Sequence, residues 1–196
     1  MIKTPSFLTP QPETGFHFRK LKIDDIDDLS TWFKTKTDKV LWAGASFLRP
    51  SVKREMKRLM KSGDATGWKR EFWAMAERDT KTLVGTFQLA FFSPAQTATL
   101  GRVAIKPDRR GQGLANPLVA FAVERAFRLK GVHRLELNVY DFNKQAIASY
   151  QRNGFQIEGL RRDAIHMDNI AWNSLVMSQL RSEYESQKPS HKGTRK

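Results

Sequence analysis

Hydrophobic and polar positions along the chain follow two periods, and each period predicts one kind of element. Apolar residues that are continuous or recur at every second position predict strands, whereas recurrence every three or four positions predicts helices. The expected strands cover residues 16–23, 71–77, 82–92, 97–105, 132–140, 155–157 and 171–180. The expected helices are a short one capped by Asp24 or Asp25, and longer ones over about 50–63, 113–130 and 143–152.

The order of these elements indicates an α/β fold. Residues 71–77, 82–92 and 97–105 are joined by short turns and so predict an antiparallel meander. One strand and two helices precede the meander, with Leu41–Gly44 as an aromatic loop before the second helix. A helix, a strand, another helix and two strands follow it. This arrangement predicts a mixed sheet flanked by helices.

The ends of the chain differ in character from its middle. A length of 196 residues favours one domain. Residues 1–15 contain three prolines and no periodicity, so they are expected to form an extended arm. The domain is expected over residues 16–181, and residues 182–196 are expected to form a disordered basic tail because their end lacks apolar anchors.

Composition excludes several classes of site. The chain has no cysteine, which excludes disulfides, thiolate zinc sites and a catalytic thiol, and which fits a reducing compartment. The four histidines show no metal-binding spacing, so no metal is expected. The amino end does not resemble a secretory signal, and no apolar run approaches the ~18 residues of a membrane span. A soluble, cytoplasmic protein without a membrane partner is therefore expected.

The net charge of +14 suggests an anionic partner. Nucleic acid, a ribosome, a membrane surface and a polyphosphate ligand would all fit it, as would a basic protein without such a partner. The sequence carries no RNA-binding signature with paired aromatic residues on strands. Nucleic acid is therefore expected only as a non-specific contact.

Residues 103–115 (VAIKPDRRGQGLA) carry the most informative local pattern. A strand leads into a loop with two glycines and two arginines, and a helix follows, which is typical of an anion site. Pro117 fits the first helical turn, so the helix is expected to begin near Leu114 and leave the amides of Gly111–Ala115 free. The spacing does not match a Rossmann or a Walker loop, because Asn116 replaces the third glycine and no Gly-Lys-Ser/Thr follows.

Two motifs resemble those of the GNAT N-acetyltransferase superfamily. Arg110–Ala115 (RGQGLA) resembles its acetyl-CoA motif, Gln/Arg-x-x-Gly-x-Gly/Ala. About 30 residues later, Asn143–Phe155 resembles the second signature, Asn-x-x-Ala-x-x-x-Tyr-x-x-x-Gly-Phe. The opening and ending of the domain look most like the branch of ribosomal-protein alanine acetyltransferases (Rim-type). That branch often has an acidic residue after an aromatic one near the last strand, where this chain has Asn173 after Trp172.

This resemblance implies both a fold and a reaction. The fold would be a mixed, mainly antiparallel sheet of six to seven strands with about four helices, splayed between the fourth and fifth strands. The reaction would transfer an acetyl group from acetyl-CoA, as cosubstrate, to a primary amine by direct attack in a ternary complex. The acceptor would be a protein amino terminus, with a ribosomal protein as one candidate, or a small-molecule amine. The protein would act as a monomer or homodimer.

The resemblance also implies roles for particular residues. Backbone groups of Val103, Ala104 and Ile105 would bind pantetheine and polarise the thioester carbonyl. Tyr150 would be the general acid, since a phenol of pKa about 10 could protonate a leaving thiolate whose conjugate acid lies near about 8.5. The remaining cofactor-binding residues would be Arg109, Arg110, Gly111, Gln112, Gly113, Leu114, Ala115, Asn143 and Ala146.

The general base and the acceptor site stay open at this level. Glu136 is a candidate base, with a structural salt bridge as the alternative, and Glu71, Glu77 and His166 are weaker candidates. Four tryptophans would either wall the acceptor site or belong to the core: Trp42, Trp68, Trp73 and Trp172. Two other functions remain possible: a basic module that binds ribosomes or nucleic acid, and a CoA-binding family member without catalysis.

Overall fold

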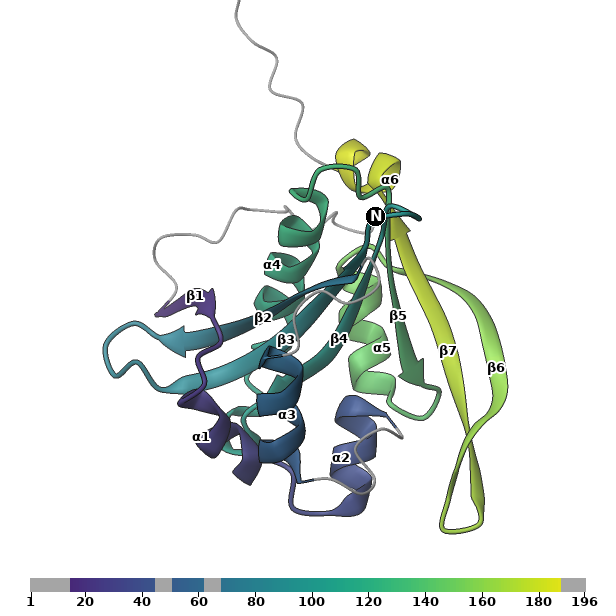
Figure 1. Ribbon diagram of the computed structural model, residues 1–196. Coiled ribbons are helices and arrows are strands. Elements are labelled where there is room, and N and C mark those ends of the chain that lie inside the picture. The colour runs from purple at the N-terminus through teal and green to yellow at the C-terminus, as the bar shows by residue number, and fades with distance from the viewer. Residues whose placement is uncertain (1–14, 45–50, 62–67, 188–196) are drawn as a thin grey trace, which may run out of the picture.

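A seven-stranded sheet forms the centre of the computed structural model, which describes residues 15–44, 51–61 and 68–187 (Figure 1). The strand order is β1-β2-β3-β4-β5-β7-β6. All neighbouring strands are antiparallel except β4 and β5, which are parallel. The strands are β1 (Phe16–Lys20), β2 (Trp68–Glu77), β3 (Leu83–Phe92), β4 (Thr97–Ile105), β5 (Arg134–Tyr140), β6 (Gln156–Met167) and β7 (Ile170–Leu180).

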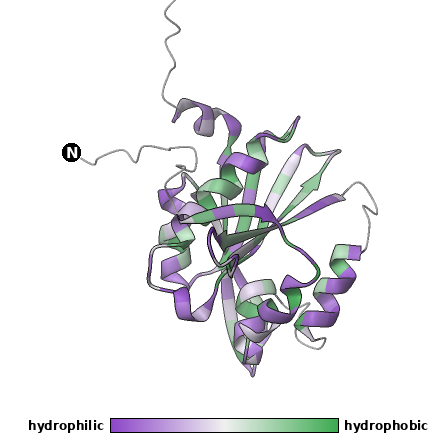
Figure 2. Ribbon diagram, turned by 90° about the vertical axis from the view of Figure 1, so that its left-hand side faces the viewer, coloured by the Kyte–Doolittle hydropathy of each residue, from purple (hydrophilic) through white to green (hydrophobic). Residues whose placement is uncertain are grey.

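Helices cover both faces of this sheet. Within the described ranges they are α1 (Asp25–Thr31), α2 (Lys36–Ala43), α3 (Val52–Lys61), α4 (Ala115–Phe127), α5 (Lys144–Arg152) and α6 (Arg181–Ser186). In Figure 2, hydrophilic and hydrophobic bands alternate along α3, as expected of a helix with one buried face. The expected mixed sheet is confirmed, with two helices more than the expected four.

Two elements differ from the sequence-based expectation near the ends of the domain. Leu41–Gly44, expected as a loop, belongs to α2 as far as Ala43. A capping box between Thr35 and Asp38 begins this helix, and its residues Val40 and Trp42 are buried against the sheet. The four polar residues of its first turn hide the apolar periodicity, so the pattern alone did not predict a helix.

The second difference concerns β6 and the beginning of the expected tail. The strand expected at 155–157 runs to Met167, and as an exposed edge strand it lacks the apolar alternation that reveals buried strands. Residues 182–186 were expected to be disordered but lie in α6, where the Tyr184 ring stacks on Phe127 at 4.8 Å. Three expected segments lie outside the described residues: residues 1–14 of the arm, residues 50, 62 and 63 of the helix expected at 50–63, and the tail from residue 188.

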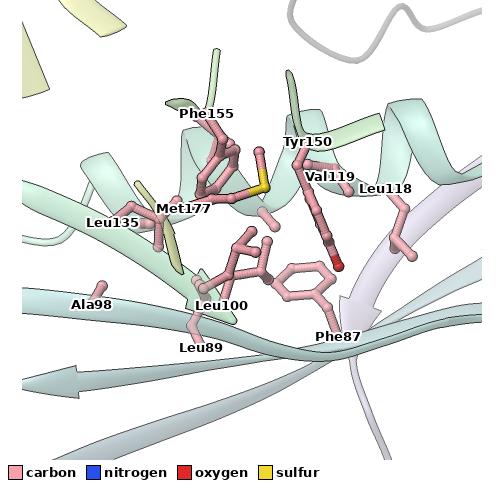
Figure 3. Packing of buried hydrophobic residues seen from close by; sticks show 14 of the residues in the cluster. Phe87, Leu89, Ala98, Leu100, Leu118, Val119, Leu135, Tyr150, Phe155 and Met177 are labelled. Carbon is pink, nitrogen blue, oxygen red and sulfur yellow. The ribbon is translucent and has the colours of Figure 1, made fainter. Parts of the chain in front are cut away.

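The two faces of the sheet carry separate hydrophobic clusters. One lies beneath α4 and α5 and includes Phe87, Leu118 and Tyr150 (Figure 3). The other lies beneath α1, α2 and α3 and includes Trp32 and Met56. Each helix layer buries its apolar stripe against one face of the sheet. The helices therefore do not cover the backbone edges of two strands where these strands separate.

The sheet opens between its two parallel strands. β4 and β5 pair only through Thr97–Thr99 and Arg134–Glu136, and beyond these residues the strands diverge (Figure 1). The expected splay between the fourth and fifth strands is therefore confirmed. Within the described segments, no helix is long and apolar enough to cross a bilayer.

Candidate active site

A cavity of about 1120 Å³ occupies the gap between β4 and β5. It runs from the loop before α4 and the inner face of α5 to α2, β7 and β6 on the opposite face of the sheet. Of the thirteen residues predicted for the site, twelve line this cavity. The exception is Gln112, whose side chain donates a 3.4 Å hydrogen bond to the Asp108 carbonyl.

The loop that enters α4 has the geometry of an anion site. Leu114 is the N-cap of α4, as the position of Pro117 predicted. Gly111 and Gly113 have φ of +77° and +74°, values that residues with a Cβ rarely adopt, so the loop depends on glycine here. Among the described residues, the structure records no acceptor for the amides of Gly111–Ala115. These amides and the start of a 13-residue helix offer partial positive charge to the cavity.

The two arginines of this loop are held in different ways. Arg109 forms an ion pair with Glu77 at the end of β2. The Arg110 side chain donates from Nε to the Ile105 carbonyl at 3.3 Å. Both residues line the cavity, so the loop combines free amides with two guanidinium groups.

A β-bulge decides which backbone groups of β4 face the gap. The register with β3 shifts between Thr86 and Gln88, so two residues of β4, Arg102 and Val103, lie opposite one residue of β3. Arg102 has a φ of +50°, and its carbonyl accepts a 2.9 Å hydrogen bond from the Trp42 indole. Trp42 on α2 therefore anchors the bulge.

Strand alternation beyond the bulge separates the three predicted backbone residues. The Lys106 amide donates to Val84 of β3, whereas the Ile105 carbonyl points the other way and accepts from Arg110. Because strand alternation directs successive residues to opposite sides, the amides of Val103 and Ile105 face the gap and that of Ala104 faces β3. Ala104 lines the cavity without offering its amide to it.

Tyr150 lines the cavity, and its ring packs in the core. The residue is 9% exposed, and its ring meets Phe155 edge-on at 5.8 Å. Figure 3 shows its hydroxyl oxygen pointing away from α5. Burial raises the pKa of the phenol, and no hydrogen bond to a described residue offsets this effect. The phenol is therefore neutral throughout the physiological pH range.

Asn143 and Ala146 have a structural relation that the motif did not predict. Asn143 is the N-cap of α5, and its side-chain oxygen accepts from the Ala146 amide at 3.3 Å. Both residues line the cavity. The spacing of three residues between them is thus explained by capping, and it fixes the start of the helix that carries Tyr150.

None of the candidate bases from the sequence lines the cavity. Glu136 pairs with Arg134 at 2.9 Å, which confirms the salt-bridge alternative. Glu71 pairs with Arg125 and Lys20, and Glu77 pairs with Arg109. His166 pairs with Asp163. Asp38 is the one carboxylate among the described lining residues, and it accepts hydrogen bonds in the capping box of α2.

The tryptophans divide between wall and core. Trp42 lines the cavity, while Trp68, Trp73 and Trp172 do not. Trp172 nevertheless supports the wall, because it meets the rings of Tyr140 and Phe142 edge-on at 5.0 and 4.9 Å. Asn173, which stands where the Rim-type branch often has an acid, hydrogen-bonds Asp163 and Asp141.

Several cavity residues were not predicted from the sequence. They come from strands that meet only in the folded sheet: Thr99, Arg102, Asn138, Tyr140, Arg161 and Ser174. No local motif marks them, although the positive φ of Arg102 marks the bulge once the structure is known. Within the described segments, no group of three histidine or acidic side chains could hold a metal ion.

The glycine loop at a helix start, the splayed strands and the buried tyrosine define a class of protein. The profile of the Acetyltransferase (GNAT) family matches residues 28–155. The chain belongs to this family.

Two curated relatives share part of the chain. An uncharacterised N-acetyltransferase, YoaA, of Bacillus subtilis is 27% identical over 108 residues, which are 54% of this chain and 60% of the relative. Spermidine N(1)-acetyltransferase of Vibrio cholerae is 27% identical over 85 residues, which are 43% of this chain and 49% of the relative. The matches thus span about half the length of these relatives.

A solved structure extends the similarity to the whole fold. The crystal structure of spermidine N-acetyltransferase from Vibrio cholerae in complex with CoA and spermine has a TM-score of 0.74 and 19% sequence identity. The match covers 87% of this chain and 98% of that chain. At this identity the similarity shows the fold alone. The narrower resemblance to the Rim-type branch finds no support in these relatives.

Proposed function

We propose that the protein transfers an acetyl group from acetyl-CoA to a primary amine by direct attack within a ternary complex. The observation that carries the proposal is the cavity in the splayed sheet. It joins a row of free amides at a helix start to a buried, neutral phenol. The first feature suits a pyrophosphate and the second suits a leaving thiolate. The similarity to an acetyltransferase crystallised with CoA supports the same assignment.

The proposal assigns each part of the cavity one task. The amides of Gly111–Ala115 and the side chain of Arg110 bind the pyrophosphate. The amides of Val103 and Ile105 bind pantetheine and polarise the thioester carbonyl. Binding at both places aligns the acetyl group with the gap between β4 and β5, where an amine can approach from the side of α2.

The chemical step then needs one proton donor within the cavity. The amine nitrogen forms a bond to the carbonyl carbon, the carbon–sulfur bond breaks, and the Tyr150 hydroxyl gives its proton to the sulfur. The amine releases its own proton to water, and the Tyr150 phenolate takes a proton back from water to complete the cycle. Since Asp38 is the one described carboxylate in the cavity and serves as a helix cap, no side chain is assigned as a base. An α-amine has a pKa of about 8 and an alkyl amine one of about 10, so either must lose a proton to solvent before it attacks.

Two alternatives from the sequence stay distinct from this proposal. A CoA-binding protein without catalysis would bind acetyl-CoA and release no thiol. A ribosome- or nucleic-acid-binding module would use the net charge of +14, and the family match does not support it. A ribosomal-protein acceptor is not part of the proposal, because the relatives described above include an enzyme named for spermidine and none named for a ribosomal protein.

An acetyl-CoA turnover assay over a panel of amines tests the proposal. The chain contains no cysteine, so a thiol reagent detects only the CoA released and the enzyme contributes no background. We expect thiol release that depends on the amine and an acetylated product of matching mass. Acetyl-CoA binding without thiol release from any amine would overturn the proposed function.

A further inference from the structure

The charges that line the cavity are strongly unequal. Six basic side chains line it, against the single described carboxylate of Asp38. The positions of these cations divide the cavity into two halves. The coenzyme half is formed by the loop 109–115 and α5, and it carries Arg109, Arg110, Lys144 and Arg152. The acceptor half lies on the sheet face towards α2, and it carries Arg102 and Arg161.

CoA accounts for the cations of the coenzyme half. A 3′-phosphate and a diphosphate together carry about four negative charges, which is enough for Arg110, Lys144 and Arg152, while Arg109 already pairs with Glu77. Lys144 and Arg152 lie eight residues apart on α5 and share one face of the helix. In the acceptor half, Arg102 has the carboxylate of Glu55 nearby, so Arg161 is the cation there that CoA and the described residues leave without a match.

The register of three strands places Arg161 in the acceptor half. Tyr140 lies opposite Ser174, and Ser174 lies opposite Arg161. Residues opposite one another in antiparallel strands share a face, so these three side chains form a row. Val139, the neighbour of Tyr140, belongs to the core beneath α4 and α5, and the row therefore lies on the other face. Among the described residues, the structure records no ion pair for Arg161.

Arg102 reaches the same face of the sheet from β4. Its guanidinium donates to the Gln88 side chain at 2.5 Å, a neutral partner on β3. Burial and the neighbouring charge of Arg70 lower the pKa of Arg102 to about 10, although the nearby carboxylate of Glu55 acts to raise it. Arg102 thus has partners within the fold, and Arg161 is the cation of this half that is left to an acceptor.

We infer that the acceptor is a small amine that also carries an anionic group, such as a carboxylate, phosphate or sulfonate, and that Arg161 binds this group. The inference rests on the proposed function and specifies its acceptor. The β6 backbone lies two strand spacings from β5, about 10 Å, so a short molecule can place its amine in the gap and its anion at Arg161. A polyamine would bring further positive charge to a cavity lined by arginines.

The acceptor preference is measured with pairs of molecules that differ in one charge. ω-Amino acids of three to six carbons are compared with the corresponding ω-amino amides and with spermidine, at saturating acetyl-CoA. We expect kcat/KM for the amino acids to exceed that for the amides by about 10- to 100-fold, the range of a charge-assisted hydrogen bond. Equal values, or a preference for spermidine, overturn the inference and leave the proposed function intact.

Arg161 and its neighbour Arg162 provide a matched pair of variants. Both are exposed on β6, but only Arg161 lines the cavity. Arg161→Gln is expected to raise KM for the preferred amino acid about 10-fold or more with kcat within about 3-fold. Arg161→Lys should restore part of the affinity, and Arg162→Gln should leave both constants within about 2-fold. Equal effects of the two glutamine variants would show that surface charge, not the site, carries the preference. If no amine is acetylated while acetyl-CoA still binds, the proposed function fails and the inference fails with it.

Discussion

The hydroxyl of Tyr150 provides the sharpest test of the proposed chemistry. Tyr150→Phe removes one oxygen and keeps the ring, which packs against Phe155 at 5.8 Å. No hydrogen bond from the hydroxyl to a described residue is lost, since burial is the one cause of the raised pKa of this phenol. The free energy of unfolding should therefore change by less than about 0.5 kcal/mol.

Turnover should respond far more strongly than stability. General acid catalysis is worth about 10²–10⁴-fold, so kcat should fall by that factor, or about 2.7–5.4 kcal/mol, if departure of the sulfur limits the rate. The acetyl-CoA affinity should change little, because the amides of Gly111–Ala115 and of β4 remain. The assay measures kcat, acetyl-CoA affinity and melting temperature on one preparation.

A matched control and a second substrate make the result decisive. Tyr184→Phe removes the same oxygen from a ring that stacks on Phe127 outside the cavity, and it should leave kcat unchanged. A thioester with a better leaving group should rescue Tyr150→Phe, because its sulfur needs less help from an acid. If Tyr150→Phe has the same kcat as the wild type, both with acetyl-CoA and with the thioester that has the better leaving group, the general-acid role is refuted.

Four other outcomes follow from the described contacts. Gly113→Val should weaken acetyl-CoA binding about 10-fold or more, since φ of +74° disfavours a branched side chain and the branch crowds the phosphate; calorimetry on the folded variant checks this. Acetyl-CoA affinity should also fall as salt rises, and an affinity that stays flat would assign binding to pantetheine instead. Asn143→Ala removes the N-cap of α5 and should lower the free energy of unfolding by about 1 kcal/mol. If only the acetyl-CoA affinity falls, Asn143 contacts the cofactor directly. Raising the pH above about 10 should destabilise the wild type more than Tyr150→Phe, because the raised pKa of the buried phenol keeps it protonated in the folded state while the unfolded phenol ionises; melting curves from pH 8 to 11.5 compare the two.

Glu71, which lies outside the cavity, gives a test of structure without catalysis. Glu71 receives hydrogen bonds from Arg125 at 2.6 Å and from the Trp73 indole at 2.9 Å, and it pairs with Lys20 at 3.0 Å. Burial acts to raise the pKa of Glu71, but these partners outweigh it and lower the pKa. The group therefore stabilises the fold above about pH 4.3 and loses this effect as the pH falls. Glu71→Gln should lower the melting temperature at pH 7 and leave kcat intact.

The glycine loop and the helix that carries Tyr150 could be predicted from the chain because their signals are local. The amides at the start of α4, the proline in its first turn and the glycines with positive φ all lie within residues 111–117. Likewise, the spacing from Asn143 to Tyr150 follows from one helix and its cap. A contiguous segment carries its own geometry, so the motif predicted the start of α4 and the position of Tyr150 correctly.

Elements without an apolar face were missed for a physical reason. β6 is an edge strand with almost every side chain exposed, so hydrophobicity does not alternate along it. The first turn of α2 is polar, and its capping box is the stronger signal. Secondary structure is predicted from the periodicity of apolar residues, which arises because one face of an element is buried. These elements have little buried surface and therefore little periodicity.

The acceptor half of the cavity depends on tertiary structure alone. Arg161 reaches it because β6 pairs with β7 and β7 with β5, and Trp42 reaches it because α2 packs over the bulge at Arg102. A shift of one residue in either register would turn Arg161 to the other face of the sheet. The sequence alone therefore specified the glycine loop at the start of α4 and the position of Tyr150, whereas long-range strand pairing decided which charged side chains line the cavity.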